Sequence, residues 1–119
     1  MKKAIIAALA LCALLAALSG CGKAKTYAVP WDQFCLALED SSEIRLTAAE
    51  KDAVVDILNR GVWTDGLSDC DCDCVFYTQR QEVRYASGIG VFNDLTRQKS
   101  LTVTQAQRQR INGFLTDGK

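Results

Sequence analysis

The 119-residue chain contains no histidine and only one proline, Pro30. The absence of histidine removes the commonest general base and the commonest transition-metal ligand of proteins. Charge of neither sign is in excess overall, and two of the 14 basic residues, Lys2 and Lys3, lie in an apolar N-terminal stretch. The rest of the chain therefore carries 12 basic and 14 acidic residues. This balance argues against nucleic acid as a partner, because phosphate neutralisation needs a clear basic excess on one face.

The sequence also lacks a paired nucleophile and base and a glycine-rich loop that could cradle phosphate. Once the N-terminal stretch is set aside, about 90 residues remain, enough for one domain but with little room for a deep substrate pocket. We therefore expect a non-enzymatic protein with no cofactor.

The N-terminal stretch has the form of an export signal. Lys2 and Lys3 precede an apolar run, residues 4–18, and small residues follow it. A basic start, an apolar run of this length and small residues at its end are typical of a secretory signal peptide, and the run is short for a stable membrane span. The alternative, an uncut anchoring helix, is disfavoured because only Lys23 and Lys25 follow the run as stop-transfer charges.

The run ends in Leu18-Ser19-Gly20-Cys21, which resembles the lipobox of bacterial lipoprotein precursors: Leu, a small residue, Gly or Ala, then Cys. The resemblance implies diacylglyceryl transfer to the Cys21 thiol and cleavage between Gly20 and Cys21 by the lipoprotein signal peptidase. It implies anchoring to the extracytoplasmic face of a cell membrane. Two or three acyl chains anchor stably, since each buried methylene contributes about 0.8 kcal/mol. The resemblance covers the leader alone and implies nothing about the fold of the body.

We divide the chain into a signal peptide (1–20), a lipidated N-terminus and tether (21–30) and one small α+β domain (31–119). Alternating apolar residues predict a hairpin over 31–46, although a helix over 31–38 also fits the spacing. Thr47 and Glu50 form a capping box, which predicts a helix over 48–60 with Gly61 as its stop. Val62 and Trp63 are expected to fold back onto the core.

The second half is predicted to be mostly strand. Residues 72–77 and 83–91 alternate, with a loop at 78–82 between them and a polar loop at 93–100. Gly88 and Gly90 indicate a bulge or a close approach by another segment. Residues 101–107 then repeat the pattern of residues 44–50, either through duplication or because strand-to-helix junctions commonly have this form. The predicted fold is an antiparallel sheet of four or five strands with two helices packed on one face.

The segment 68–74 is the one unusual composition in the body, because cysteine and aspartate alternate through it. Its three cysteines are Cys70, Cys72 and Cys74. Together with Cys35, they allow three interpretations. As a metal site they have the wrong spacing, since structural zinc sites use Cys-x(2–4)-Cys, and the aspartates do not complete a calcium loop. As a redox site they could form a structural bridge from Cys35, with a pairing that sequence does not determine. As core residues, Cys72 and Cys74 would share an apolar face with Phe76, while the aspartates point to water.

Two weaker surface patterns are also present. Five aromatic residues could line a ligand groove, although aromatics in so small a body more often form core: Tyr27, Trp31, Trp63, Tyr77 and Tyr85. Four basic residues could face anionic lipid or a cell-wall polymer, although a solvated helix face is the more common role: Arg97, Lys99, Arg108 and Arg110.

Two functional hypotheses follow. The first is an envelope lipoprotein, held to the membrane through Cys21, whose body binds an envelope protein, a peptide or a cell-wall component. The alternative is a metal-binding or thiol-redox accessory lipoprotein that uses Cys35, Cys70, Cys72 and Cys74.

Overall fold

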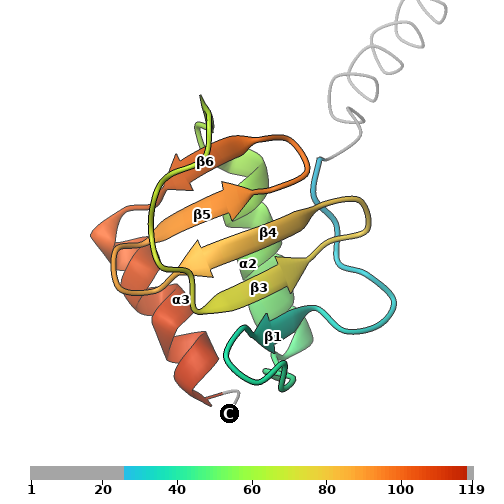
Figure 1. The fold of residues 1–119 in the computed structure, drawn as a ribbon. Helices are drawn as coiled ribbons and strands as arrows, with labels where there is room; N and C mark the ends of the chain where they lie inside the picture. Colours follow the sequence, from blue (N-terminus) through green and yellow to red (C-terminus); the bar gives the residue numbers. More distant parts are fainter. Residues whose placement is uncertain (1–25, 118–119) are drawn as a thin grey trace, which may run out of the picture.

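The computed structural model describes residues 26–117. Its elements are β1 (Cys35–Ala37), α2 (Ala48–Arg60), β2 (Thr64–Asp65), β3 (Cys74–Tyr77), β4 (Glu82–Ala86), β5 (Val91–Asp94), β6 (Lys99–Thr102) and α3 (Gln105–Asp117). The strands form one antiparallel sheet in the order β1-β3-β4-β5-β6-β2 (Figure 1). The predicted α+β class with an antiparallel sheet is confirmed, but the described part of the chain has six strands rather than four or five.

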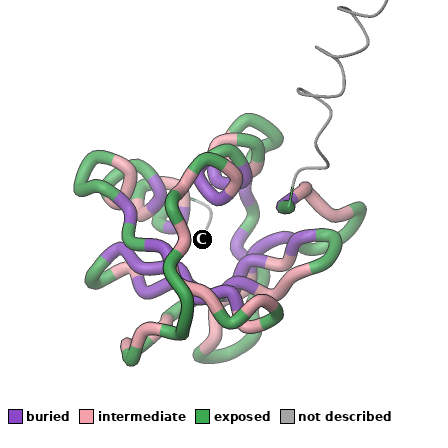
Figure 2. Tube along the Cα trace, turned by 90° about the horizontal axis from the view of Figure 1, so that it is seen from above, coloured by how far each residue is buried: buried purple, intermediate pink, exposed green. Residues whose placement is uncertain are grey.

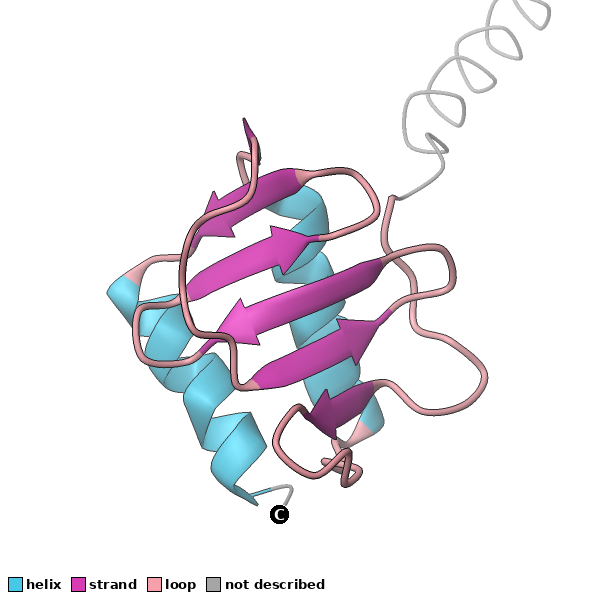
Figure 3. Ribbon diagram, viewed as in Figure 1, coloured by secondary structure: helices cyan, strands magenta, loops and turns pink. Residues whose placement is uncertain are grey.

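Both helices lie against the same face of the sheet (Figure 3). Buried residues lie on the sheet and on the helix sides that face it (Figure 2), and they form one apolar core. Aromatic rings occupy its middle: the ring of Phe76 lies 5.4 Å from that of Phe34 and 5.8 Å from that of Phe92, between centroids. Tilted and edge-on ring pairs of this kind stabilise a core beyond the burial of their area.

The capping box predicted for α2 is present. The Thr47 hydroxyl accepts from the Glu50 amide over 3.1 Å, and the Glu50 carboxylate accepts from the Thr47 amide over 2.8 Å. The helix ends before Gly61, as predicted, but not through a left-handed cap, because Gly61 has φ −66°. A Cβ at Gly61 would lie 2.5 Å from Leu101 Cδ2. The glycine is needed because β6 passes close to the end of α2.

The second strand-to-helix junction repeats the first, as the sequence predicted. The Thr104 hydroxyl accepts from the Gln107 amide over 3.1 Å, and the Gln107 side chain accepts from the Thr104 amide over 2.9 Å. The two junctions differ in the strand that precedes them. Leu101 lies in β6, whereas Ile44 is buried outside any strand, next to an isolated bridge between Leu36 and Glu43.

The prediction of one strand over 83–91 is wrong. Residues 87–90 form a turn between β4 and β5, and Gly90 has φ +70°, a conformation that side chains rarely adopt. A Cβ at Gly90 would also lie 3.1 Å from Val103 Cγ2, so the close approach suggested by its glycines exists. The predicted loop 93–100 is likewise wrong at its ends, because Asn93 and Asp94 end β5 and Lys99 begins β6. Apolar and polar residues keep alternating through the tight turn at residues 87–90, so the sequence pattern could not reveal where β4 ends and β5 begins.

The predicted hairpin over 31–46 is shorter in the structure. Only Cys35–Ala37 forms a strand, and residues 38–42 turn the chain back to the isolated bridge at Glu43. Trp63 folds back as expected: its indole N–H donates to the Leu58 carbonyl over 2.8 Å. Val62 does not, since 84% of it is exposed.

The face of the sheet away from the helices is partly covered by the segment between β2 and β3, residues 66–73, which passes in front of the strands in Figure 1. The side chain of Asn93, on that face, holds this segment in place. It accepts from the Ser68 amide over 2.9 Å and donates to the Ser68 carbonyl over 2.9 Å. Val75, Ala86 and Val91 are buried although they lie outside the helix-side core. Among residues 26–117, neither helix is long and apolar enough to cross a bilayer.

Candidate functional site

A β-bulge at the start of β3 shapes the candidate site. The Asp73 amide donates to the Tyr85 carbonyl over 2.9 Å, and Tyr85 is already the register partner of Cys74. Two consecutive residues therefore oppose one residue of β4, and strict alternation is broken. Cys72, Asp73 and Cys74 all line the cavity beside α3, and the Cys72 thiol also hydrogen-bonds Asn93, the side chain that holds residues 66–73 to the other face. Of the three residues predicted to share an apolar face, Cys74 and Phe76 lie together in the buried core, whereas Cys72 is only half-buried and is not part of it.

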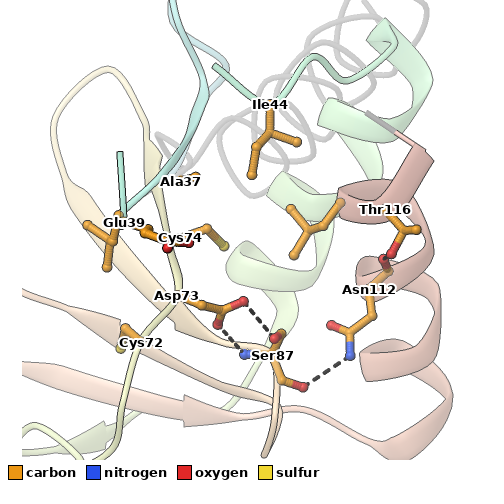
Figure 4. A pocket seen from close by; sticks show the side chains of 11 residues that line it. Ala37, Glu39, Ile44, Cys72, Asp73, Cys74, Ser87, Asn112 and Thr116 are labelled. Atoms are coloured by element: carbon orange, nitrogen blue, oxygen red, sulfur yellow. Dashed lines mark hydrogen bonds between the residues drawn. The ribbon is translucent and has the colours of Figure 1, made fainter. Parts of the chain in front are cut away.

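The cavity created at this bulge has a volume of about 660 Å³ and opens between the β1–β3 edge and the C-terminal half of α3 (Figure 4). One part of its lining is apolar and the other polar. Among the lining residues within 26–117, two of the polar side chains are acidic and none is basic. The lining consists of Ala37, Leu38, Glu39, Ile44, Cys72, Asp73, Cys74, Ser87, Asn112, Leu115 and Thr116. We call this cavity the β3–α3 cleft.

Hydrogen bonds fix the polar wall of the cleft. The two carboxylate oxygens of Asp73 accept from the Ser87 amide over 2.7 Å and from the Ser87 hydroxyl over 2.6 Å. The Ser87 carbonyl accepts from Asn112 Nδ2 over 3.0 Å and from Arg108 Nε over 3.0 Å, as Figure 4 shows for Asn112. Asn112 Oδ1 accepts from the Tyr85 hydroxyl over 3.0 Å. These side chains are therefore positioned before any ligand binds, which lowers the entropic cost of binding.

Burial, followed by the electrostatic effects of the neighbouring Cys74 and Asp73, raises the pKa of the Tyr85 hydroxyl well above its ordinary value. The hydroxyl therefore stays protonated across the physiological range and remains a donor to Asn112. This fixes the amide orientation of Asn112, with its oxygen toward the core and its NH2 toward Ser87 and the cleft.

The four cysteines of the body are free thiols and form two pairs. Cys35 and Cys74 are 0% and 1% exposed on the helix side, and their thiols are hydrogen-bonded to each other. Cys70 and Cys72 are half-buried, hydrogen-bonded to each other and in contact with Asn93. Cys35 and Cys74 belong to the buried core, whereas Cys70 and Cys72 contact Asn93, the side chain that holds residues 66–73.

One thiol of each pair, Cys74 and Cys72, has a raised pKa. The hydrogen bond to Cys35, together with burial, raises the pKa of the Cys74 thiol far above its ordinary value. Burial, followed by the neighbouring Cys70, raises the pKa of the Cys72 thiol to about 11. Because the thiolate is the nucleophile and the metal ligand, neither thiol is prepared for either role at neutral pH. Among residues 26–117, no group of three or more Cys, Asp or Glu side chains is arranged to hold a metal ion.

The structure distributes the other sequence candidates over different regions. Tyr27 and Tyr85 are core residues, Trp63 is half-buried and Trp31 is 99% exposed. The four basic residues do not form one patch: Arg97 donates to the Tyr27 hydroxyl, whereas Arg108 donates to the Ser87 carbonyl, at the opposite end of β4. The predicted lipobox, with Gly20 and Cys21, lies outside the described residues.

Sequence reasoning found part of the cleft and missed the rest. It singled out Cys72 and Cys74 but expected Asp73 to point to water. It did not find Ser87, Asn112 or Thr116, which come from the β4–β5 turn and from α3 and carry no motif. The available signal was weak: Asn112 is a polar residue next to the buried Ile111 in an amphipathic helix.

Comparison of the chain with known protein families, with curated proteins and with solved structures gives no match.

Proposed function

We propose that the protein is a lipid-anchored lipoprotein of the extracytoplasmic membrane face, whose body binds a peptide ligand of the cell envelope without catalysing a reaction. The observation that carries the proposal is Leu18-Ser19-Gly20-Cys21 at the end of a short apolar run. Multiple acylation at Cys21 would hold the body next to a membrane surface.

The β3–α3 cleft supports a binding role. It combines a pre-positioned polar wall, formed by Asp73, Ser87 and Asn112, with an apolar wall that includes Ile44 and Leu115. Cavities with a few fixed polar groups on an otherwise apolar lining are the usual form of small-ligand sites.

The charges of the cleft favour one ligand chemistry. Glu39 and Asp73 are acidic, and none of the described residues that line the cleft is basic. An amine would be attracted to these carboxylates and a carboxylate repelled. Short peptides with a lysine-type amine and apolar side chains match both walls, whereas acidic peptides do not.

The alternative, a metal-binding or thiol-redox accessory protein, has less support. Cys70 and Cys72 are accessible enough to react, but the raised pKa of Cys72 keeps its thiol protonated at neutral pH. A redox or metal role would favour a lowered pKa instead.

Metabolic labelling tests the anchor. Radiolabelled palmitate is expected to enter the wild-type protein and not the Cys21→Ser variant, and only the wild type should remain with membranes after fractionation. Cys70→Ser is the matched control, because it changes a cysteine outside the lipobox and should leave labelling intact. A wild-type protein that takes up no palmitate, or that is full length and soluble, would contradict the proposal.

Amide NMR of the mature lipidated protein in detergent micelles tests the cleft, with short lysine-containing and glutamate-containing peptides as probes. The lysine peptides should shift signals around Ser87 and Asn112, and the glutamate peptides should not. Thr116→Trp fills the cleft and should abolish the shifts. Ala106→Trp places the same side chain at another exposed position of α3 and should leave them unchanged. Equal binding of both peptide classes, or no shift with either, would rule out this ligand chemistry.

A further inference from the structure

The N-terminal end of the body is rigidly fixed at Tyr27, which is 1% exposed. Its amide donates to Asn59 Oδ1 over 3.0 Å, and its carbonyl accepts from Asn59 Nδ2 over 2.9 Å. Its hydroxyl donates to Asp94 over 2.6 Å and accepts from Arg97 over 2.8 Å, and its ring stacks on Trp63 at 5.4 Å. Tyr27 therefore moves with the body.

Tyr27 is only six residues after Cys21. A fully extended chain covers at most about 3.5 Å per residue, so Tyr27 lies within roughly 20 Å of Cys21. If Cys21 carries the lipid, as the proposed function requires, the end of the body that contains Tyr27 must lie next to the bilayer.

Trp31 is at this same end and is 99% exposed, the most exposed of the large apolar residues in the described part of the chain. The loop that carries it, residues 28–33, protrudes beside the β3–β4 turn (Figure 1). The loop is held on both sides: the Gln79 amide donates to the Ala28 carbonyl over 3.2 Å, and the Tyr77 amide donates to the Phe34 carbonyl over 2.8 Å. The exposed indole is therefore presented on a supported loop.

We propose that Trp31 inserts into the head-group region of the membrane that holds the Cys21 lipid. Tryptophan is enriched at membrane interfaces because its ring is apolar and its N–H needs a polar partner. One such contact is weak alone, but the tether gives it a high effective concentration at the surface. An open hollow of about 510 Å³ beside the indole leaves room for a lipid head group.

The neighbouring charges limit the depth of insertion. Asp32 follows Trp31 directly and is exposed, and a carboxylate is costly in hydrocarbon. Arg80 is exposed on the adjacent β3–β4 turn and would favour phosphate groups. The indole is therefore expected at head-group level rather than among the acyl chains.

This orientation has a consequence for the β3–α3 cleft. Ser87 and Asp73 lie at the opposite ends of β4 and β3 from the β3–β4 turn beside Trp31. With Trp31 at the membrane, the cleft opens away from the bilayer, where envelope peptides can reach it.

Fluorescence quenching tests the proposal. The mature lipidated protein is reconstituted into phosphatidylcholine vesicles whose lipids carry bromine either near the head groups or deep in the acyl chains. Shallow bromines should quench the tryptophan emission strongly and deep bromines weakly. Trp31→Ala should lose most of the quenching, whereas Trp63→Phe should retain it.

Palmitate content and vesicle binding, measured on the same samples, separate the two proposals. A lipidated, folded protein whose Trp31 is not quenched by shallow bromines would overturn the insertion of Trp31 alone, and would instead leave the indole available to a protein partner. A protein without lipid would overturn the anchor on which the inference rests. Quenching that persists in Trp31→Ala would also contradict the proposal.

Discussion

Of the two glycines Gly61 and Gly113, only Gly61 is required by packing. Gly61 ends α2 where Leu101 leaves no space for a side chain, whereas a Cβ at Gly113, inside α3, would meet nothing within 4 Å. Glycine inside a helix is destabilising relative to alanine, so Gly113 has no packing reason to be glycine. No feature of the structure explains its presence.

We expect Gly61→Ala to lower the free energy of unfolding by about 1–3 kcal/mol, because the added methyl group must displace the buried Leu101 side chain. Gly113→Ala, the matched control, should raise it by about 0.5–1 kcal/mol. Urea unfolding followed by circular dichroism measures both changes. Equal effects of the two substitutions would show that the approach of Leu101 does not constrain position 61.

The bulge in β3 has the largest influence of any local feature on the candidate site. It places Asp73 in the β3–α3 cleft and separates Cys72 from Cys74. Without it, the alternation of strand side chains would put Cys72 and Cys74 on one face. The same irregularity therefore determines both the polar wall of the cleft and the pairing of the thiols.

From this separation we predict which thiols can be joined by a disulfide. After treatment with diamide, a variant that keeps only Cys35 and Cys74, or only Cys70 and Cys72, should lose its free thiols. A variant that keeps only Cys72 and Cys74 should retain both in the folded state, because the Cys72 thiol is directed toward Cys70 and Asn93 and the Cys74 thiol toward Cys35. Thiol counting with and without denaturant measures the result. A bridge between Cys72 and Cys74 in the folded protein would contradict the described bulge.

The stability of the whole body is expected to fall at alkaline pH, because several buried groups keep their protons in the folded state. Burial is the largest cause that raises the pKa of Tyr27, Tyr85 and Cys72, and the hydrogen bond to Cys35, followed by burial, raises the pKa of Cys74. Above about pH 8.5 the unfolded chain begins to release protons from such groups while the folded body retains them. Stability is thus fully present below that pH and is lost as the pH rises toward the folded values.

We therefore expect the free energy of unfolding, measured with urea in reducing buffer, to be nearly constant from about pH 7 to 8 and to fall above about pH 9. Each group contributes a slope of at most about 1.4 kcal/mol per pH unit. Tyr85→Phe should be less stable at neutral pH, since Asn112 loses its donor, yet should show a shallower decline. An unchanged slope in this variant would contradict the role assigned to the buried hydroxyl.

The local elements of this protein follow from its sequence. Capping residues at Thr47 and Thr104 begin the two helices because they bond to amides only three residues away, and helical apolar spacing then follows. Such interactions depend on neighbours in the chain, so the helices and the α+β class could be predicted. The leader is also a local pattern, which is why the membrane anchor could be proposed from residues 1–21 alone.

The candidate sites depended on tertiary structure. The turn at residues 87–90 and the bulge at Asp73 leave the apolar alternation nearly intact, and only strand pairing reveals them. The β3–α3 cleft brings together residues 37 and 116, and the fixed position of Tyr27 depends on Asn59 and Asp94. Contacts between distant segments are set by how the sheet and helices pack, and a linear pattern of side chains carries no measure of that packing.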